Sequence, residues 1–188
     1  MLSGTVSGRL EAFVEIAVRT LLLMRHAKSS WDRPEVADVD RPLAPRGQEA
    51  APLIARHIKE RKWRPDLVLC SHAERVRATW QLMAPVLGRS IECRTLRAIY
   101  LGAPSRLLEA LRRAGDEVGT LMLIGHNPGL GRLAVSLCGA GPKKALARMR
   151  TKFPTATLAV IGFEVDHWRE IAPGAGRLEA FVRPKDLR

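Results

Sequence analysis

Two arginines and two histidines have the residue types and the spacing that phosphate chemistry requires. Arg25 and His26 are adjacent, Arg75 follows His26 by 75 − 26 = 49 residues, and His126 follows Arg75 by 126 − 75 = 51 residues. A guanidinium offers fixed, forked donors that can hold the oxygens of a phosphate group. One imidazole can attack phosphorus, and a second can donate a hydrogen bond to the developing charge. Together the four side chains predict a phosphate-binding catalytic site.

Short apolar segments are the elements that must position these residues. The segments have the length and composition of buried strands, and each ends next to one of the polar groups: 21–24, 66–70 and 120–124. Helical patterns separate them, so each spacing fits one strand–helix–strand excursion. Parallel strands joined in this way end at the same edge of a sheet, where open α/β sheets bind ligands. We therefore expect the arginines and histidines to converge there.

The alternation of strands and helices predicts an α/β fold, a three-layer α/β/α sandwich with a mostly parallel central sheet. We expect helices at 47–63, 73–87, 104–113 and 130–138, a more polar strand at 90–95, a basic loop at 139–153, and a β-hairpin formed by 155–163 and 168–172. The hairpin would extend the sheet at its edge. In the first helix, Pro52 is tolerated only if it lies in the first turn.

The length of 188 residues gives room for one domain with a full core. We assign residues 20–188 to this domain and residues 1–19 to an N-terminal extension, whose apolar spacing predicts a short amphipathic helix. The heptapeptide GRLEAFV occurs at 8–14 and again at 176–182, without a physical reason that the sequence reveals. No apolar run reaches membrane-spanning length. The three cysteines have apolar neighbours, which indicates buried thiols and a cytoplasmic location.

The charge balance favours acidic or phosphate-bearing partners. There are 31 Lys and Arg against 19 Asp and Glu, a net charge of +12. Only 5% of the residues are aromatic, so platforms for base stacking are scarce, and this argues against nucleic acid as the partner. A basic cluster follows the second histidine and is a candidate for steering an acidic protein: Lys143, Lys144, Arg148, Arg150 and Lys152.

Four ordered motifs now connect these observations. The segment LLLMRHAKSSW at 21–31 contains the Arg-His pair, and DRPLAPRGQEAA at 40–51 follows it. SHAERVRATW at 71–80 has a Ser-x-x-x-Arg-x-x-x-Thr pattern, and GHNPGL at 125–130 contains the second histidine. In these motifs the chain resembles the histidine phosphatase superfamily, which has the phosphoglycerate-mutase-like fold, and it is most similar to the SixA-like phosphohistidine phosphatases. Ala27 stands where many members have glycine.

The resemblance implies a role for each of the four residues. His26 would attack phosphorus and become phosphohistidine, which water then hydrolyses. Arg25, Arg75 and His126 would bind the phosphate and stabilise the transition state. Neither a metal nor another cofactor is expected, because the guanidiniums and the second imidazole supply the positive charge.

The stretch at 96–101, LRAIYL, bears on the substrate. Ester-cleaving relatives have a glutamate acid there, whereas this stretch contains no carboxylate. An ester needs a proton donor for its alkoxide, but a phosphohistidine imidazole can accept a proton on its distal nitrogen and leave neutral. We therefore expect a metal-independent phosphatase acting on phosphohistidine in a protein. Three carboxylates could still supply the acid: Asp32, Asp40 and Glu74.

Alternatives remain for the function and for several other residues. A small-molecule phosphomonoesterase or mutase of the same fold is the main alternative, and a catalytically silent phosphate-binding module is another. Lys28 and Arg41 could widen the phosphate pocket or contact an acidic partner. We expect the remaining histidines to be bystanders: His57, His72 and His167.

Overall fold

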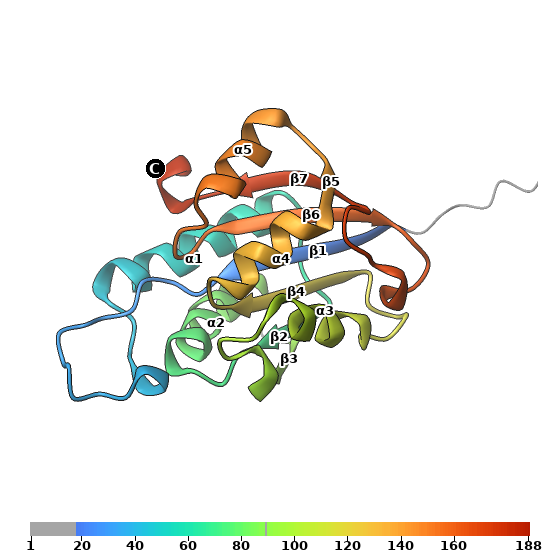
Figure 1. Cartoon of the computed structure of the whole chain (residues 1–188). Coiled ribbons are helices and arrows are strands. Elements are labelled where there is room, and N and C mark those ends of the chain that lie inside the picture. The colour runs from blue at the N-terminus through green and yellow to red at the C-terminus, as the bar shows by residue number, and fades with distance from the viewer. Residues whose placement is uncertain (1–17, 89) are drawn as a thin grey trace, which may run out of the picture.

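The computed structural model describes residues 18–88 and 90–188. The helix expected in the extension and the first copy of GRLEAFV lie outside these residues. The described strands are β1 (Val18–Arg25), β2 (Leu67–Cys70), β3 (Glu92–Thr95), β4 (Thr120–Gly125), β5 (Cys138–Ala140), β6 (Leu158–Glu164) and β7 (Gly176–Val182). They form one sheet in the order β3-β2-β4-β1-β6-β7-β5 (Figure 1).

The sheet is mostly parallel, as the alternation of strands and helices predicted. Parallel pairs join β2 to β3, β2 to β4, β1 to β4 and β5 to β7, while β6 runs antiparallel to both β1 and β7. The strands β2, β4 and β1 are consecutive neighbours, so their carboxyl ends meet at one edge of the sheet. This edge is where the Arg-His pair and the second histidine were expected.

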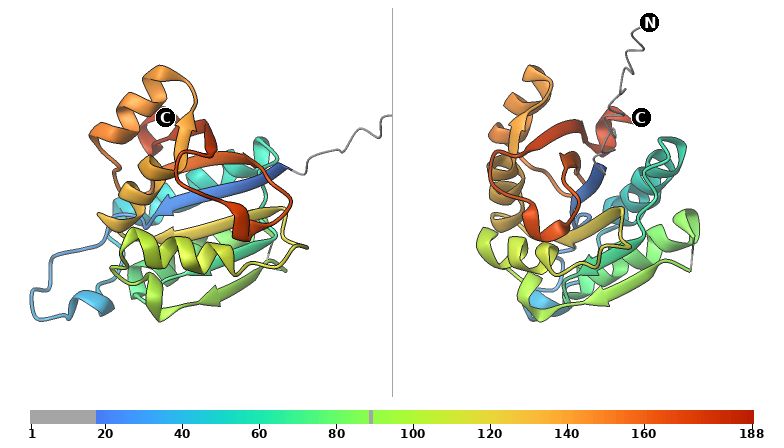
Figure 2. Two further views of the ribbon diagram at one scale, coloured as in Figure 1. Left: turned by 45° about the vertical axis from the view of Figure 1, so that its right-hand side comes forward. Right: turned by 90° about the vertical axis from the view of Figure 1, so that its right-hand side faces the viewer.

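Helices cover both faces of the sheet and confirm the three-layer prediction (Figure 2). One face packs against α1 (Pro45–Glu60) and α2 (Glu74–Leu87), and the other against α3 (Pro104–Arg112), α4 (Gly129–Leu137) and α5 (Lys143–Thr151). Along β1, Leu22 and Met24 belong to the apolar core on the side of α1 and α2. Leu21 and Leu23 belong to the core on the side of α3, α4 and α5. Full burial on both faces explains why this strand is a continuous apolar run. Among the described residues, no helix is long and apolar enough to cross a membrane.

The basic loop predicted at 139–153 is wrong, because most of it forms β5 and α5. The α5 sequence KKALARMRT buries only Met149 fully, so its apolar stripe is too narrow to stand out from the charged residues. Arg148 and Arg150 lie in the last turn, where positive charge interacts favourably with the helix dipole.

The predicted hairpin is correct for its first strand and wrong for its second. Strand β6 pairs with β7, whereas the segment assigned to the second strand contains a 3₁₀ helix, η3 (Trp168–Glu170). Trp168 and Ile171 are both fully buried, and a separation of three residues is one 3₁₀ turn, which places them on one side. The Trp168 indole also donates a hydrogen bond to the Val118 carbonyl, at 2.6 Å. The second copy of GRLEAFV is β7 itself.

Helix α1 begins at Pro45, which suits the first position of a helix because its missing N–H needs no partner there. Pro52 consequently lies in the helix interior, not in the first turn as we expected. The proline leaves the carbonyl of Gln48 without its usual helical donor. Gln48 is exposed, so water can satisfy that carbonyl.

Gly47 lets α1 approach the segment that follows β1. A Cβ atom at this position would lie 2.2 Å from the Lys28 carbonyl oxygen, which also accepts a hydrogen bond from the Ala44 N–H at 2.9 Å. We expect Gly47→Ala to shift the backbone next to His26, to destabilise the fold by about 1–3 kcal/mol and to reduce turnover. Thermal unfolding and kinetics of the purified variant would measure both effects. Gly119→Ala is the matched control, because its Cβ would lie 3.5 Å from the nearest atom, and equal behaviour of the two variants would contradict the prediction.

Candidate active site

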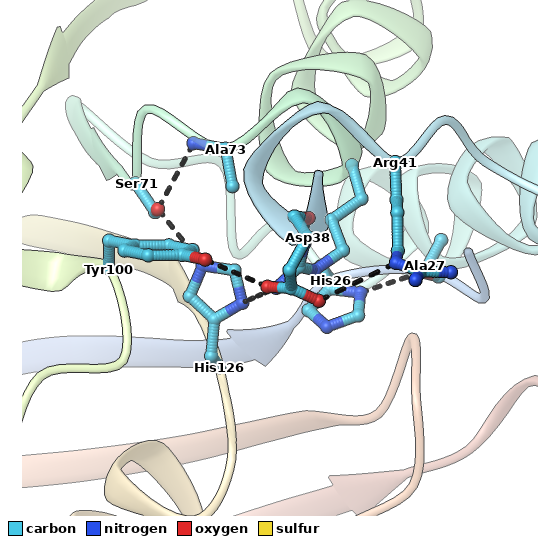
Figure 3. Close-up of polar contacts among 9 residues, drawn as sticks. His26, Ala27, Asp38, Arg41, Ser71, Ala73, Tyr100 and His126 are labelled. Carbon is cyan, nitrogen blue, oxygen red and sulfur yellow. Dashed lines mark hydrogen bonds and ion pairs between the residues drawn. The ribbon is translucent and has the colours of Figure 1, made fainter. Parts of the chain in front are cut away.

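The carboxyl edge of the sheet brings the four predicted residues together. Arg25 ends β1 and His26 follows it, His126 follows β4, and Arg75 is the second residue of α2, which begins shortly after β2. The ring centroids of the two histidines are 5.1 Å apart (Figure 3). Arg75 Nη2 lies 3.2 Å from His126 Nδ1. Both imidazoles and the Arg75 guanidinium are buried, so water is largely excluded from them.

His26 has a tautomer suited to nucleophilic attack. Its Nδ1 lies 2.7 Å from the Ala27 carbonyl oxygen, and a carbonyl can only accept a hydrogen bond. Nδ1 therefore carries the hydrogen, which leaves the lone pair on Nε2. The pKa of His26 is lowered to about 4, mainly by burial. The hydrogen bond to Ala27 raises this pKa, and the positive charges of Arg75 and Arg25 lower it. The ring is consequently neutral at pH 7.

His126 has the opposite tautomer. A guanidinium can only donate, so His126 Nδ1 accepts from Arg75 and Nε2 carries the hydrogen. Nε2 then donates to the Ser71 hydroxyl oxygen at 2.9 Å. Burial, and after it the neighbouring charges of His26 and Arg75, lower the pKa of His126 to about 3. Before an anion binds, this ring is also neutral at pH 7.

The two tautomers are testable by NMR. At pH 6, below the ordinary histidine pKa, we expect both rings to remain neutral, with the hydrogen on Nδ1 in His26 and on Nε2 in His126. Two-bond ¹H–¹⁵N correlation spectra, assigned with His26→Gln and His126→Gln, would measure this. A protonated His26 at pH 6 would contradict the prediction.

The lowered pKa values of both histidines also link protein stability to pH. Unfolded histidines bind protons near pH 6.5, so the free energy of unfolding that these two groups contribute is present above that pH and is lost as the pH falls towards 4.

The two arginines leave positive charge around His26. Arg25 Nη1 donates to the Phe153 carbonyl at 2.9 Å, while its Nε is buried and makes no hydrogen bond to any described residue. Burial and the charge of Arg75 lower the pKa of Arg25. The Asn127 side chain donates to the same Phe153 carbonyl at 2.9 Å, so it helps to fix the loop that holds Arg25. The unpaired Nε of Arg25 and the nearby charge of Arg75 can together hold an anion.

The Ser-x-x-x-Arg-x-x-x-Thr motif has a structural reason. Ser71 follows β2, whereas Arg75 and Thr79 are four residues apart within α2 and therefore lie on one face at its start. Thr79 Oγ1 accepts a hydrogen bond from the Ala27 N–H at 3.0 Å and donates to the Arg75 carbonyl at 2.6 Å. The motif thus ties α2 to the residue after His26.

Asp38 and Tyr100 are site residues that the sequence did not reveal. Asp38 Oδ2 accepts a hydrogen bond from the Tyr100 hydroxyl at 2.8 Å (Figure 3). It also accepts one from Arg75 Nη2 at 2.9 Å. The Tyr100 ring also packs edge-on against His126, with centroids 5.3 Å apart. Burial by itself would raise the pKa of Asp38, but the hydrogen bonds from Tyr100 and Arg75 hold it below its ordinary value. The carboxylate is therefore ionised.

The three carboxylates predicted as possible acids make other contacts. Glu74 forms an ion pair with Arg77 at 3.0 Å, and Asp32 accepts a hydrogen bond from the Ser30 hydroxyl at 2.7 Å. Asp40 is exposed. Asp38 lies with Asp32 and Asp40 in the loop between β1 and α1. The path of that loop decides which of the three carboxylates reaches Arg75.

Arg41 lies near the site, whereas Lys28 is exposed. The Arg41 guanidinium is 3.9 Å from the centre of the Trp31 ring, and its Nε is 3.8 Å from Asp38 Oδ1. Its Nε and Nη1 atoms are buried and make no hydrogen bond to the described residues. Arg41 can therefore offer donors to a bound anion.

The remaining histidines have different surroundings. His72 is half-buried and packs edge-on against Tyr100, with centroids 5.0 Å apart, so it contacts the site through that residue. His57 is half-buried on α1 and packs against Trp63. His167 lies 2.9 Å from Asp116. Within residues 18–88 and 90–188, no group of three or more His, Cys, Asp or Glu side chains is placed to hold a metal ion.

Comparison with known families decides the classification. The family model described as the histidine phosphatase superfamily (branch 1) matches residues 21–119, more than half of the chain. The chain belongs to the histidine phosphatase superfamily. The match includes Arg25, His26 and Arg75, and the sequence continues beyond it to His126.

Related proteins agree with this classification. An uncharacterized protein of Mycobacterium tuberculosis is 38% identical over 165 residues, which cover 86% of this chain and 100% of that protein. The structure of a proposed phosphohistidine phosphatase SixA from Nakamurella multipartitia has 27% identity and a TM-score of 0.78, covering 89% of this chain and 97% of that one. A proposed SixA from Agrobacterium tumefaciens has 31% identity and a TM-score of 0.74, covering 88% and 98%. This histidine phosphatase superfamily member therefore has the SixA-like, phosphoglycerate-mutase-like fold that its motifs predicted.

Proposed function

We propose that the chain is a phosphatase that removes the phosphoryl group from phosphohistidine in a protein, through a covalent intermediate on His26. The observation that carries the proposal is the free Nε2 lone pair of a neutral, buried His26 next to the positive charges of Arg75 and Arg25, together with an Arg25 Nε that makes no hydrogen bond to the described residues. This combination provides a nucleophile and a site for the phosphate oxygens.

The reaction has two steps. In the first, His26 Nε2 attacks phosphorus in line, the P–N bond of the substrate breaks, and the substrate imidazole leaves with its electron pair. In the second, water attacks the phosphoryl group on His26, the P–Nε2 bond breaks with its electron pair returning to Nε2, and inorganic phosphate leaves with the protons of the water. Arg25 and Arg75 hold the equatorial oxygens in both steps. The bound negative charge favours protonation of His126 on Nδ1, which replaces the hydrogen bond from Arg75 Nη2 and lets this Nδ1–H donate to the phosphoryl group.

The lack of a suitable acid at 96–101 and beside Arg75 supports phosphohistidine as the substrate class. The stretch at 96–101 has no carboxylate. Within this stretch, the Tyr100 ring packs against His126. Asp38 is the carboxylate bound to Arg75, and its lowered pKa makes it a poor proton donor. An alkoxide leaving group needs such a donor, whereas an imidazole can leave after accepting a proton on its distal nitrogen. The likeness to structures described as proposed phosphohistidine phosphatases agrees with this substrate class.

Asp38 occupies donors of Arg75 that a phosphate would use. Asp38→Asn keeps the shape of the side chain and removes its charge, so we expect phosphate and vanadate to bind about fivefold more tightly, the effect of ~1 kcal/mol for a partly exposed ion pair. Inhibition constants for vanadate would measure this. Asp40→Asn is the matched control, because Asp40 is exposed and lies in the same short helix, η1 (Asp38–Asp40). Weaker vanadate binding by Asp38→Asn would contradict competition and indicate that Asp38 orients Arg75.

A substrate panel tests the proposed function. It should contain a phosphohistidine-bearing carrier protein, free phosphohistidine, a sugar phosphate and phosphoglycerate. We expect kcat/KM to be highest for the phosphoprotein by orders of magnitude. A sugar phosphate or phosphoglycerate that exceeds the phosphoprotein would favour the alternative, a small-molecule phosphomonoesterase or mutase.

A further inference from the structure

A groove with an unusual charge lies next to His26. It has a volume of about 630 Å³ and is lined by the segment after β1, the end of α5 and the C-terminal residues. Its other lining residues are alanine, proline and threonine, and no acidic side chain among the described residues lines it. We call it the basic groove and define it by its seven basic residues: Lys28, Arg46, Arg148, Lys152, Arg183, Lys185 and Arg188.

The basic groove adjoins the segment that holds His26. Lys28 is two residues from His26, and Ala156, on the groove wall, donates its N–H to the His26 carbonyl at 3.0 Å. Lys152 lies next to Phe153, whose carbonyl accepts from Arg25. A chain bound at His26 through one side chain can therefore extend into the groove.

Most of the positive charge in the basic groove is not neutralised by the protein. Arg148 and Arg183 share one carboxylate, Asp186, at 2.6 and 2.7 Å, and Arg188 pairs with Glu49 at 3.3 Å. The other four basic residues form no ion pair within the described part of the chain: Lys28, Arg46, Lys152 and Lys185. Such a surface attracts a negatively charged partner.

The lining chemistry favours a polypeptide over a nucleic acid. No aromatic side chain lines the basic groove among the described residues, so bases would have no stacking platform. The positive charge comes from four separate segments of the chain, which suits several carboxylates along an extended chain. We propose that the basic groove binds an acidic segment of the protein substrate next to its phosphohistidine, an inference that rests on the proposed function.

A binding experiment tests the groove without relying on catalysis. The probe is a fluorescein-labelled hexaglutamate peptide, titrated with the full-length protein at several salt concentrations. The groove variant combines Arg46→Gln, Lys152→Gln and Lys185→Gln. The charge-matched control combines three exposed residues outside the groove: Arg56→Gln, Arg106→Gln and Arg169→Gln. We expect the groove variant to bind on the order of tenfold more weakly, with a smaller salt dependence, and the control to change less than about twofold.

Kinetics then connect the groove to the substrate. With the phosphoprotein, the groove variant should have a higher KM and an unchanged kcat, because docking charges mainly affect association. Turnover of free phosphohistidine should be unchanged, which also confirms that the variant is folded.

The possible outcomes separate the two proposals. Loss of hexaglutamate binding together with no turnover of any phosphoprotein supports the groove and overturns the proposed substrate. Phosphoprotein turnover with equal behaviour of groove and control variants supports the proposed function and overturns the groove. Tighter binding of a single-stranded RNA oligonucleotide than of hexaglutamate at 150 mM salt, about the physiological ionic strength, would overturn the choice of an acidic polypeptide.

Discussion

His26→Gln is expected to lower kcat by at least about four orders of magnitude, because it removes the atom that forms the covalent bond to phosphorus. Glutamine has a comparable length and can still hydrogen-bond in the buried position. It has no ring nitrogen with a free lone pair, so neither step of the proposed reaction can proceed by the same route. Steady-state turnover of a phosphohistidine protein would measure the loss.

A matched control is available on α1. His57→Gln changes a half-buried histidine that packs against Trp63, and it should keep turnover within about twofold. Vanadate should still bind to His26→Gln, since Arg25 and Arg75 remain, which would show that the site has folded. Turnover of His26→Gln at the wild-type rate would exclude His26 as the nucleophile.

Arg75→Gln is expected to lower kcat by about two to three orders of magnitude. The guanidinium bonds to Asp38 and to His126 at once, and it is 5% exposed, so few waters could replace it. Glutamine removes the positive charge and leaves the Asp38 carboxylate close to the site where the phosphate binds. The loss should therefore be accompanied by weaker vanadate binding, measured in the same inhibition assay.

Arg77→Gln provides the control for Arg75. Arg77 lies one half-turn further along α2, is exposed and pairs with Glu74, so turnover should be almost unaffected. Thermal unfolding of both variants would separate a loss of folding from a loss of catalysis. A folded Arg75→Gln variant with wild-type kcat and vanadate affinity would contradict the assigned role.

The apolar runs and their spacing were sufficient to predict the parallel centre of the sheet and the edge where the four candidate residues meet. The run at 21–24 fits a strand buried on both faces, and the spacings of 49 and 51 residues, from 75 − 26 and 126 − 75, fit parallel crossovers. Because β1, β2 and β4 are consecutive neighbours, the residues after them had to converge. This part of the site follows from periodicity and topology.

The parts that could not be predicted depend on loop conformation and on weak patterns. Asp38 is one of several acids in the segment between β1 and α1, and only the path of that segment selects it as the partner of Arg75. Helix α5 buries a single residue fully, Met149, so its pattern is hidden among its charges. The η3 turn was interpreted as a strand because buried Trp168 and Ile171 fit either structure in a short segment.

Rapid acid-free quenching with a ³²P-labelled phosphohistidine protein tests the covalent intermediate most directly. We predict a burst of label on the enzyme that approaches one phosphoryl group per chain, is stable to alkali and labile to acid, and maps to His26 by mass spectrometry. Turnover without any labelled enzyme, or label on a residue other than His26, would contradict the proposed mechanism.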